Sequence, residues 1–226
     1  MTLRINTSKV DPADYLEKLE KAGISVKTTY FEEAVTLDTA QPYHTLPGWA
    51  SGLVSIQDFG AISVGRIFVE HIQDSTISNK KILDACAAPG GKLFHVFELI
   101  KRLTLETPMS AIEIKTKRLK NMLDTAERLG HEVCITRGDA TLSDWWDQNQ
   151  YTHILVDAPC TSSGTIAKNP DVKILLNSNR IKETQEKQFA ILSKLWDKLT
   201  PGGSIFYSTC SINHYNPFEY SPKTLK

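Results

Sequence analysis

Residues 81–103, KILDACAAPGGKLFHVFELIKRL, decide the fold of this chain. The apolar run KILDA is typical of a short buried strand, and the segment that starts at Gly91 has the apolar spacing of a helix. Gly90 and Gly91 let the backbone approach a ligand closely, and the first turn of the helix offers free N–H groups. The stretch therefore predicts a strand, a ligand-binding glycine turn and a helix, although a plain strand-to-helix turn has the same outline.

The same alternation of strand and helix continues on both sides of this stretch. Further apolar strands are expected at residues 110–114, 133–136, 153–157 and 204–208, and helices at residues 61–72, 115–129 and 180–199. Strands that alternate with helices predict an α/β fold with a doubly wound, mostly parallel sheet. Cys134 lies inside the strand at 133–136 and is expected to belong to the core.

Residues 1–50 have a different pattern and predict a small N-terminal α/β subdomain. Asp11 is a suitable N-cap, Pro12 suits the first helical position, and Gly23 is a helix stop. Two short β-like runs follow, at residues 24–31 and 34–39. The turn-rich segment QPYHTLPGWASG then marks a boundary, so the larger domain is expected to occupy residues 51–226.

The composition is that of an ordinary globular α/β protein. The chain has 226 residues, of which 41% are hydrophobic and 23% charged, enough for one domain with a small appendage. Its formal net charge is zero, whereas nucleic-acid-binding domains are usually basic, so such a partner would have to be met by local patches. No apolar run reaches the roughly 18 residues that span a bilayer, and no signal peptide is apparent. Four cysteines without a C-x-x-C pair favour reduced thiols in the cytoplasm, and no metal site is expected.

Acidic residues follow the next two strands, at the edge where the glycine turn lies. Glu113 stands about 20 positions beyond the glycines, the usual place of a ribose-binding acid, and Asp139 follows the third strand. Each has a plain alternative, a solvated strand end for Glu113 and a turn residue for Asp139. Cys86 and Leu93 occupy positions that exclude a Walker A loop, and the dinucleotide fingerprint G-x-G-x-x-G is absent. The glycine turn and the two acids together favour an adenosine-shaped ligand.

Two cysteines, Cys160 in DAPC and Cys210 in STCS, each lie just beyond a predicted strand. Since the carboxyl ends of parallel strands meet at one edge of a sheet, both thiols are expected beside the glycine turn. The polar sequence around Cys160 disfavours a core position, and Ile166 excludes a C-x5-R phosphatase loop. No histidine stands in a context typical of a cysteine protease. Asp157 precedes Cys160 by three residues and can hydrogen-bond a polar ring held near the thiols. The two thiols beside the glycine turn indicate covalent chemistry next to a bound cofactor.

Three segments together resemble a known family. DACAAPGGK, DAPCTSSGTIAKNPDVK and YSTCS are similar to the signature segments of the NOL1/NOP2/Sun family of RNA 5-methylcytosine methyltransferases. The similarity runs from about Leu3 to Ser211 and is closest to the bacterial Sun/Fmu type, which acts on small-subunit ribosomal RNA. The resemblance implies a Rossmann-like fold, S-adenosyl-L-methionine as cofactor, and methyl transfer to C5 of a cytosine in RNA. The base must be unstacked to enter such a pocket, so a single-stranded or loop cytosine is expected.

The resemblance also implies a role for each site residue. Cys210 would attack cytosine C6, Cys160 would release the product, and Asp157 would hold the edge of the base and also help to bind the cofactor. Glu113 would bind the ribose hydroxyls of the cofactor, and Asp139 its adenine. The backbone of the turn would cradle the methionine part of the cofactor, through Cys86, Ala87, Ala88, Pro89, Gly90, Gly91 and Lys92.

The chain does not match the family pattern throughout. After STCS it reads INHYNPFEYSPKTLK in place of an acidic segment and a final hairpin, and the helical N-terminal domain of larger members has no counterpart. The chain therefore resembles a member truncated at both ends, and its activity is expected to depend on missing domains or on a second chain. A methyltransferase of small molecules or proteins, and a non-catalytic remnant that binds cofactor or RNA, are the alternatives.

RNA would be contacted by the small N-terminal subdomain and by a basic cluster after Cys160. This cluster contains Lys168, Lys173, Arg180 and Lys182. A second cluster lies on the predicted helix at 115–129 and contains Lys115, Lys117, Arg118 and Lys120. A solvated helix face explains the second cluster at least as well as RNA binding does.

Overall fold

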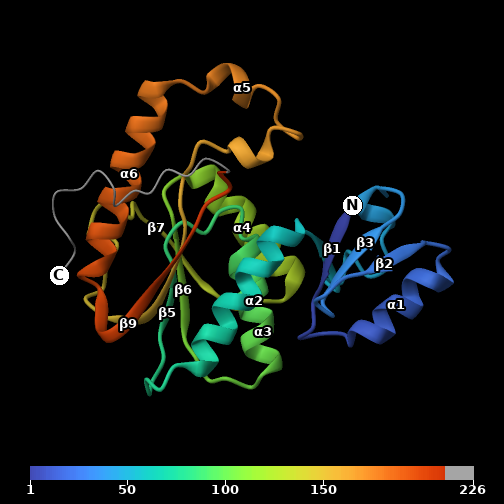
Figure 1. Cartoon of the computed structure of the whole chain (residues 1–226). Helices are drawn as coiled ribbons and strands as arrows, with labels where there is room; N and C mark the ends of the chain where they lie inside the picture. Colours follow the sequence, from blue (N-terminus) through green and yellow to red (C-terminus); the bar gives the residue numbers. More distant parts are fainter. Residues whose placement is uncertain (212–226) are drawn as a thin grey trace.

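The computed structural model describes residues 1–211, which form two α/β units that lie side by side (Figure 1). The larger unit contains a five-stranded sheet in the order β7-β6-β5-β8-β9, in which every neighbouring pair is parallel. Its strands are β5 (Ile82–Asp84), β6 (Met109–Glu113), β7 (Cys134–Arg137), β8 (Tyr151–Asp157) and β9 (Leu199–Ser208). The doubly wound α/β fold expected from the sequence is therefore present.

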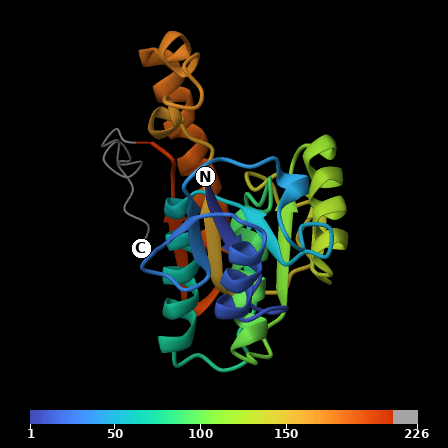
Figure 2. The same cartoon turned by 90° about the vertical axis from the view of Figure 1, so that its right-hand side faces the viewer.

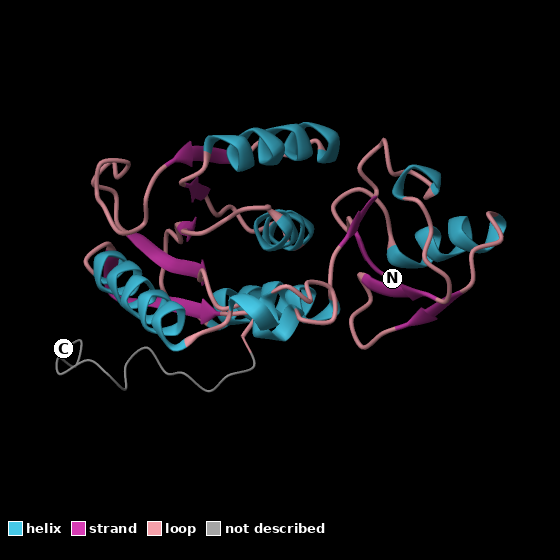
Figure 3. Cartoon of the chain, turned by 90° about the horizontal axis from the view of Figure 1, so that it is seen from above, coloured by secondary structure: helices cyan, strands magenta, loops and turns pink. Residues whose placement is uncertain are grey.

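Helices cover both faces of this sheet. They are α2 (Phe59–Asp74), α3 (Gly91–Arg102), α4 (Thr116–Leu129) and α6 (Ser178–Trp196). Successive residues of a strand point to opposite faces, so Ile82 packs with residues of α2, α3 and α4, and Leu83 with residues of α6. Seen from above, the layer formed by α2, α3 and α4 stands between the large sheet and the small unit (Figure 3).

The small unit is an antiparallel sheet of four strands in the order β2-β3-β1-β4, accompanied by one α-helix. Its elements are β1 (Thr2–Ile5), α1 (Pro12–Lys21), β2 (Val26–Thr28), β3 (Ala34–Leu37), the 3-10 turn η1 (Tyr43–Thr45) and β4 (Val54–Ile56). The carboxylate of Asp11 accepts the N–H of Ala13, which forms the expected N-cap. Because β4 pairs with β1, the boundary predicted after residue 50 lies one strand before this sheet ends.

The strand order reverses between β5 and β8. From β5 the chain winds through β6 to β7, and it then returns to the other side of β5 to form β8 and β9. Ligands of open α/β sheets bind at such a switch point, outside the carboxyl ends of the strands. Asp84, the last residue of β5, pairs with Leu155 of β8, two residues before Asp157. The glycine turn and the DAPC segment therefore meet at the switch point.

The segment between β8 and α6 extends above the sheet, and Figure 2 shows it standing above the rest of the molecule together with the start of α6. It contains the 3-10 turn η2 (Ser163–Thr165) and the short helix α5 (Val172–Leu175), in the stretch between the strand expected at 153–157 and the helix expected at 180–199. Lys168 of this segment forms an ion pair with Asp58, the residue that precedes α2. This contact ties the extension to the junction between the two units.

The prediction that Cys134 belongs to the core is wrong, because this cysteine is exposed. It lies in β7, the edge strand of the sheet, which is covered less than the central strands. The departure from the family pattern after Ser211 falls in residues 212–226, which lie outside the described residues. No helix within residues 1–211 is long and apolar enough to cross a membrane.

Candidate active site

A cavity of about 420 Å³ opens at the switch point of the large sheet. Its volume lies in the range of small-molecule pockets. It is lined by Ala85, Cys86, Ala88, Ile112, Glu113, Ile114, Lys115, Arg118, Gly138, Asp139, Ala140, Asp157, Ala158, Pro159, Cys160, Ser162, Lys187, Ile191 and Cys210. The two predicted thiols and the three predicted acids therefore share one cavity.

The glycine turn borders this cavity with a backbone that requires glycine. Gly90 has a φ of 96°, in the left-handed region, and a Cβ there would lie 2.5 Å from the ring of Phe94. Cys86 and Ala88 line the cavity, and burial raises the pKa of Cys86 to about 12, so this thiol stays protonated. The other residues of the predicted cradle do not line it, namely Ala87, Pro89, Gly90, Gly91 and Lys92.

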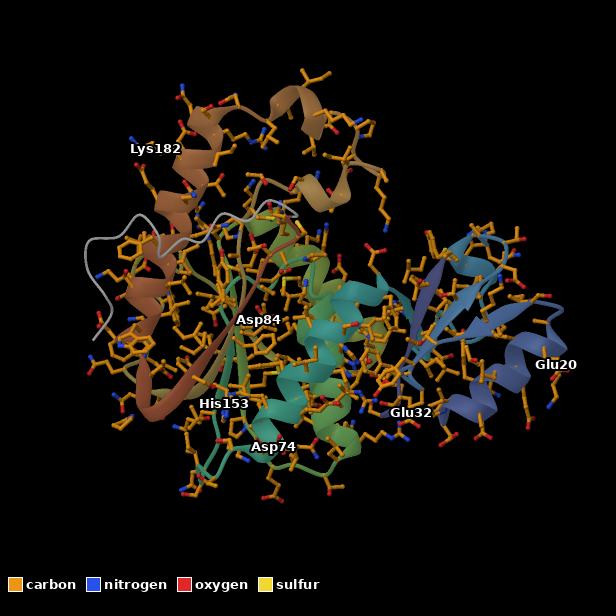
Figure 4. The ribbon with its side chains drawn as sticks, viewed as in Figure 1. Glu20, Glu32, Asp74, Asp84, His153 and Lys182 are labelled. Atoms are coloured by element: carbon orange, nitrogen blue, oxygen red, sulfur yellow. The ribbon has the colours of Figure 1, made fainter. Side chains whose placement is uncertain are left out.

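Asp84 is buried directly before the turn, and Figure 4 shows it in the middle of the large unit. Its Oδ1 accepts the N–H of Cys86 at 3.3 Å, while its Oδ2 has no hydrogen-bond partner among the described residues. Burial, reinforced by the negative charge of Asp157, raises the pKa of Asp84 to about 7. This carboxyl therefore still holds a proton in part of the molecules at neutral pH, a property that the sequence did not indicate.

Glu113 and Asp139 present carboxylates at the ends of β6 and β7. Glu113 is only 5% exposed, and its Oε1 accepts the N–H of Lys115 at 2.8 Å. Oδ1 of Asp139 accepts the N–H and the hydroxyl of Thr141, at 2.9 and 2.7 Å. Asp139 thus stabilises a turn, which was the alternative to ligand binding that the sequence left open for it. It also lines the cavity.

The cavity lining also contains apolar side chains, among them Ile112, Ala140 and Ile191. Carboxylates accept hydrogen bonds from hydroxyl and amino groups, and apolar side chains suit a purine ring. These lining residues and the two acids therefore fit the adenosine part of the cofactor that the resemblance implies.

Asp157 stands at the end of β8 between a cation and a hydroxyl. Lys92 Nζ donates to its Oδ2 at 2.6 Å, and Ser208 Oγ donates to its Oδ1 at 3.1 Å. The two side chains of the ion pair are 30% and 17% exposed for Asp157 and Lys92. These contacts fix the carboxylate between the glycine turn and the thiols. Lys92, predicted as part of a backbone cradle, thus contributes through its side chain.

The thiols of Cys160 and Cys210 face each other with a distance of 2.9 Å between their sulfurs. Cys160 is half-buried and Cys210 is exposed. The hydrogen bond from Cys210 lowers the pKa of Cys160 to about 6, and the same bond raises the pKa of Cys210. The pair therefore loses its first proton near neutral pH and holds the second one tightly.

The basic residues predicted to bind RNA lie away from the cavity wall. Lys168 pairs with Asp58, Lys173 lies in α5, and Arg180 lies in the first turn of α6, all of them exposed. Lys182 projects from the outer side of α6 (Figure 4). The structure thus does not bring this cluster together with the thiols.

Other cations line the cavity instead. Lys115 and Arg118 reach it from the start of α4, and Lys187 reaches it from α6. None of the three forms an ion pair with another of residues 1–211. In the sequence, a solvated helix face explained Lys115 and Arg118 at least as well as RNA binding did, and Lys187 was not singled out. The spacing of four residues between Lys187 and Ile191 places both on one helix face, a signal that was available.

Known proteins resemble this chain over nearly its whole length. A family model described as 16S rRNA methyltransferase RsmB/F matches residues 75–219, and a model described as the ferredoxin-like domain of RsmF/B-like methyltransferases matches residues 1–44. The ribosomal RNA small subunit methyltransferases B of Klebsiella pneumoniae and Vibrio cholerae are 36% and 38% identical to it, each over 94% of the chain. The matched region makes up 47% of each relative, so the chain spans about half the length of these curated relatives.

A solved structure has the same arrangement of both units. It is described as a methyltransferase homolog protein from Pyrococcus horikoshii and is 27% identical, with a TM-score of 0.76. The match covers 94% of this chain and 65% of that one. The expected Rossmann-like methyltransferase fold with a small N-terminal α/β unit is thereby confirmed.

Proposed function

The chain belongs to the RsmB/F family of 16S rRNA methyltransferases, and we propose that it transfers a methyl group from S-adenosylmethionine to C5 of a cytosine in ribosomal RNA. The observation that carries this proposal is the thiol pair, with the sulfurs of Cys160 and Cys210 2.9 Å apart on the cavity that Asp157 also lines. Cytosine C5 is a poor nucleophile, and a thiolate that adds to C6 makes C5 reactive. This chemistry needs one group that attacks and one that completes release, and the cavity offers both.

S-adenosylmethionine would supply an electrophilic methyl group, and on its transfer to C5 the bond from this methyl to the sulfonium sulfur would break with its electron pair kept by the sulfur. Glu113 would accept hydrogen bonds from the ribose hydroxyls of the cofactor, and Asp139 would accept one from its adenine amino group, since both acids line the cavity. The glycine turn would hold its amino-acid part through Cys86 and Ala88, the residues of the turn that line the cavity. These assignments are supported by the position of both acids on the same cavity as Cys86.

Cys210 is proposed as the nucleophile. Its thiolate sulfur forms a bond to C6, and the electron pair of the C5–C6 double bond then makes C5 the nucleophilic carbon. Asp157 would accept a hydrogen bond from the amino group of the base, with its own charge balanced by Lys92. Once C5 carries the methyl group, the Cys160 thiolate removes the C5 proton. The electron pair of that C–H bond restores the double bond and expels the Cys210 thiolate.

The proton between the two sulfurs gives Cys210 a route to its reactive form. At neutral pH Cys160 is the thiolate of the pair, because the hydrogen bond from Cys210 lowers its pKa to about 6. A shift of that proton across the 2.9 Å between the sulfurs makes Cys210 the thiolate when a base is in place. Cys160 then gives the proton to solvent before it accepts the one from C5.

RNA is proposed to reach the cavity between its two basic rims. Lys115 and Arg118 lie on the α4 side and Lys187 on the α6 side, where they can contact phosphates that flank an unstacked cytosine. The more distant residues Lys168, Lys173 and Arg180 and the small unit would extend this contact. Local cations of this kind are compatible with a formal net charge of zero.

The test is incubation of the chain with S-adenosylmethionine and unmodified small-subunit ribosomal RNA that carries tritium at cytosine C5. We expect tritium release and a 5-methylcytosine at a defined position. Cofactor binding without turnover would instead identify a non-catalytic binding protein. Methyl transfer to another acceptor without tritium release would identify a different methyltransferase. Activity that appears only with a second chain would assign this one to half of an enzyme.

A further inference from the structure

We propose that Arg4, in the small N-terminal unit, is a positioning residue for the glycine turn that holds the cofactor. This inference rests on the proposed function, because it concerns the same cofactor site. Arg4 lies in β1, and the turn lies in the other unit, at the start of α3. The small unit would then act on cofactor binding as well as on RNA.

Arg4 holds α3 at two points. Its Nε and Nη2 donate to the two carboxylate oxygens of Glu98, each at 2.9 Å, and its Nη1 donates to the carbonyl oxygen of Gly91 at 2.6 Å. Nη1 also donates to Oε1 of Gln57. The guanidinium fork matches a carboxylate in geometry, so this contact fixes direction as well as distance.

The two points lie on the same face of the helix. Gly91 and Glu98 are seven residues apart, which is about two helical turns, or roughly 10 Å along the axis. A single side chain that holds both points fixes where α3 begins and how the helix is directed. Lys92, the next residue, donates to Asp157 at 2.6 Å. The position of Gly91 therefore also influences the position of Asp157, the acid beside the thiols.

Burial makes these contacts hard to replace. Arg4 is 1% exposed and Glu98 0% exposed, and His131 Nε2 also lies 3.1 Å from Glu98 Oε1. Burial is the largest influence on Glu98 and disfavours its charged form, but the charge of Arg4, the hydrogen bond and charge of His131 and the charge of His95 together lower the pKa of Glu98. A buried ion pair is weak support for stability in itself, whereas its fixed geometry can specify the position of a neighbouring group.

A purely structural joint between the two units is the competing explanation, and two other arginines provide it for comparison. Arg66 pairs with Glu33 of the small unit. Arg128 donates to the carbonyl oxygens of Trp49 and Val54, at 2.8 and 3.1 Å, and its guanidinium lies 4.1 Å from the centre of the Trp49 ring. No hydrogen bond joins either arginine to Gly91 among the described residues.

The test compares Arg4→Lys with Arg128→Lys in the full chain. Both changes keep the charge and remove a guanidinium fork at the joint, but only the first reaches the turn. We expect Arg4→Lys to weaken S-adenosylmethionine binding in calorimetry about tenfold, which is the loss of about 1.4 kcal/mol. Hydrogen exchange of residues 86–93 should also become faster. Arg128→Lys should lower the melting temperature but change cofactor affinity by less than about twofold.

Equal cofactor affinity of wild type and Arg4→Lys, with unchanged exchange in the turn, would overturn the proposal. If Arg4→Lys does not fold, the same measurements are made on Glu98→Gln. This variant keeps the side-chain size and one oxygen acceptor but loses one of the two hydrogen bonds from the guanidinium of Arg4. Affinity unchanged in Glu98→Gln would then overturn it. A wild-type chain that binds no S-adenosylmethionine would contradict the proposed function itself, which is a different outcome.

Discussion

The sulfurs of Cys160 and Cys210 lie 2.9 Å apart although 50 positions separate them in the chain. The register of two parallel strands produces this contact, since Asp157 of β8 pairs with Ser208 of β9. The two cysteines follow these paired residues by three and two positions. A proton shared between two sulfurs is therefore a property of the sheet register, and it can be measured directly.

The first prediction concerns the thiolate of the pair. Thiolate absorbance near 240 nm, measured in a Cys134→Ser background, should show a transition at a pH of about 6 that belongs to Cys160. In Cys210→Ala this transition should move to higher pH, because the hydrogen bond that lowers the pKa of Cys160 is lost. A transition that stays at the same pH without Cys210 would show that the hydrogen bond is not its cause.

The second prediction separates attack from release. Cys210→Ala should reduce methyl transfer by about three orders of magnitude or more and leave cofactor binding intact, because it removes the proposed nucleophile. Cys160→Ala should instead accumulate a covalent complex with RNA that survives denaturing electrophoresis. An active Cys210→Ala enzyme would exclude the first role, and absence of the complex would exclude the second.

The third prediction concerns the ribose site. Glu113→Gln should weaken S-adenosylmethionine binding about tenfold or more, because a hydrogen bond to a charged group contributes about 1.5–3 kcal/mol. Calorimetry measures the effect. Glu132→Gln, at an exposed glutamate that does not line the cavity, is the matched control and should bind normally. Equal affinities of the two variants would remove Glu113 from the cofactor site.

The fourth prediction concerns pH and the buried carboxyl of Asp84. Its pKa in the folded protein is raised to about 7 from an ordinary value of 3.8, so its contribution to stability is complete below pH 3.8 and is lost as the pH rises through 7. The side-chain amide that replaces the carboxyl in the variant Asp84→Asn does not titrate. The melting temperature of Asp84→Asn minus that of the wild type should therefore be higher at pH 8.5 than at pH 5. The gain should be a few degrees, since 1 kcal/mol corresponds to about 2–4 °C at this size. A difference that is the same at both pH values would contradict the assignment.

The fifth prediction concerns RNA at the rim of the cavity. Lys187→Ala should lower RNA affinity several-fold and reduce the salt dependence of binding by about one unit of slope, as expected for one phosphate contact. Lys194→Ala is the matched control, at an exposed lysine of the same helix that does not line the cavity. Filter binding at several salt concentrations measures both. Equal losses in the two variants would indicate general attraction to the helix and no specific contact at the cavity.

The edge of the large sheet was predictable because each functional side chain follows an apolar strand. Parallel strands end at one edge, so Glu113, Asp157 and Cys210 had to lie near one another once the strands were recognised. The sequence does not distinguish an edge strand from a central one, and for this reason Cys134 was expected in the core. The pairing of Lys168 with Asp58 joins residues 110 positions apart, and no local pattern indicates it.

The strand that carries Arg4 was not predicted, for a related reason. A charged residue inside the four residues TLRI interrupts the apolar pattern that identifies a buried strand. The arginine can be buried there only because Glu98, 94 positions later, faces it. A buried charged residue can thus be assigned to a core strand only when its ion-pair partner is known.

The contact of Arg4 with Gly91 and Glu98 has a consequence for how such proteins can diverge. If Arg4 positions the glycine turn as proposed, recombination that exchanged the small unit would keep the full cofactor affinity only where the incoming strand carries an arginine at this place. The two units would then not be interchangeable as independent modules.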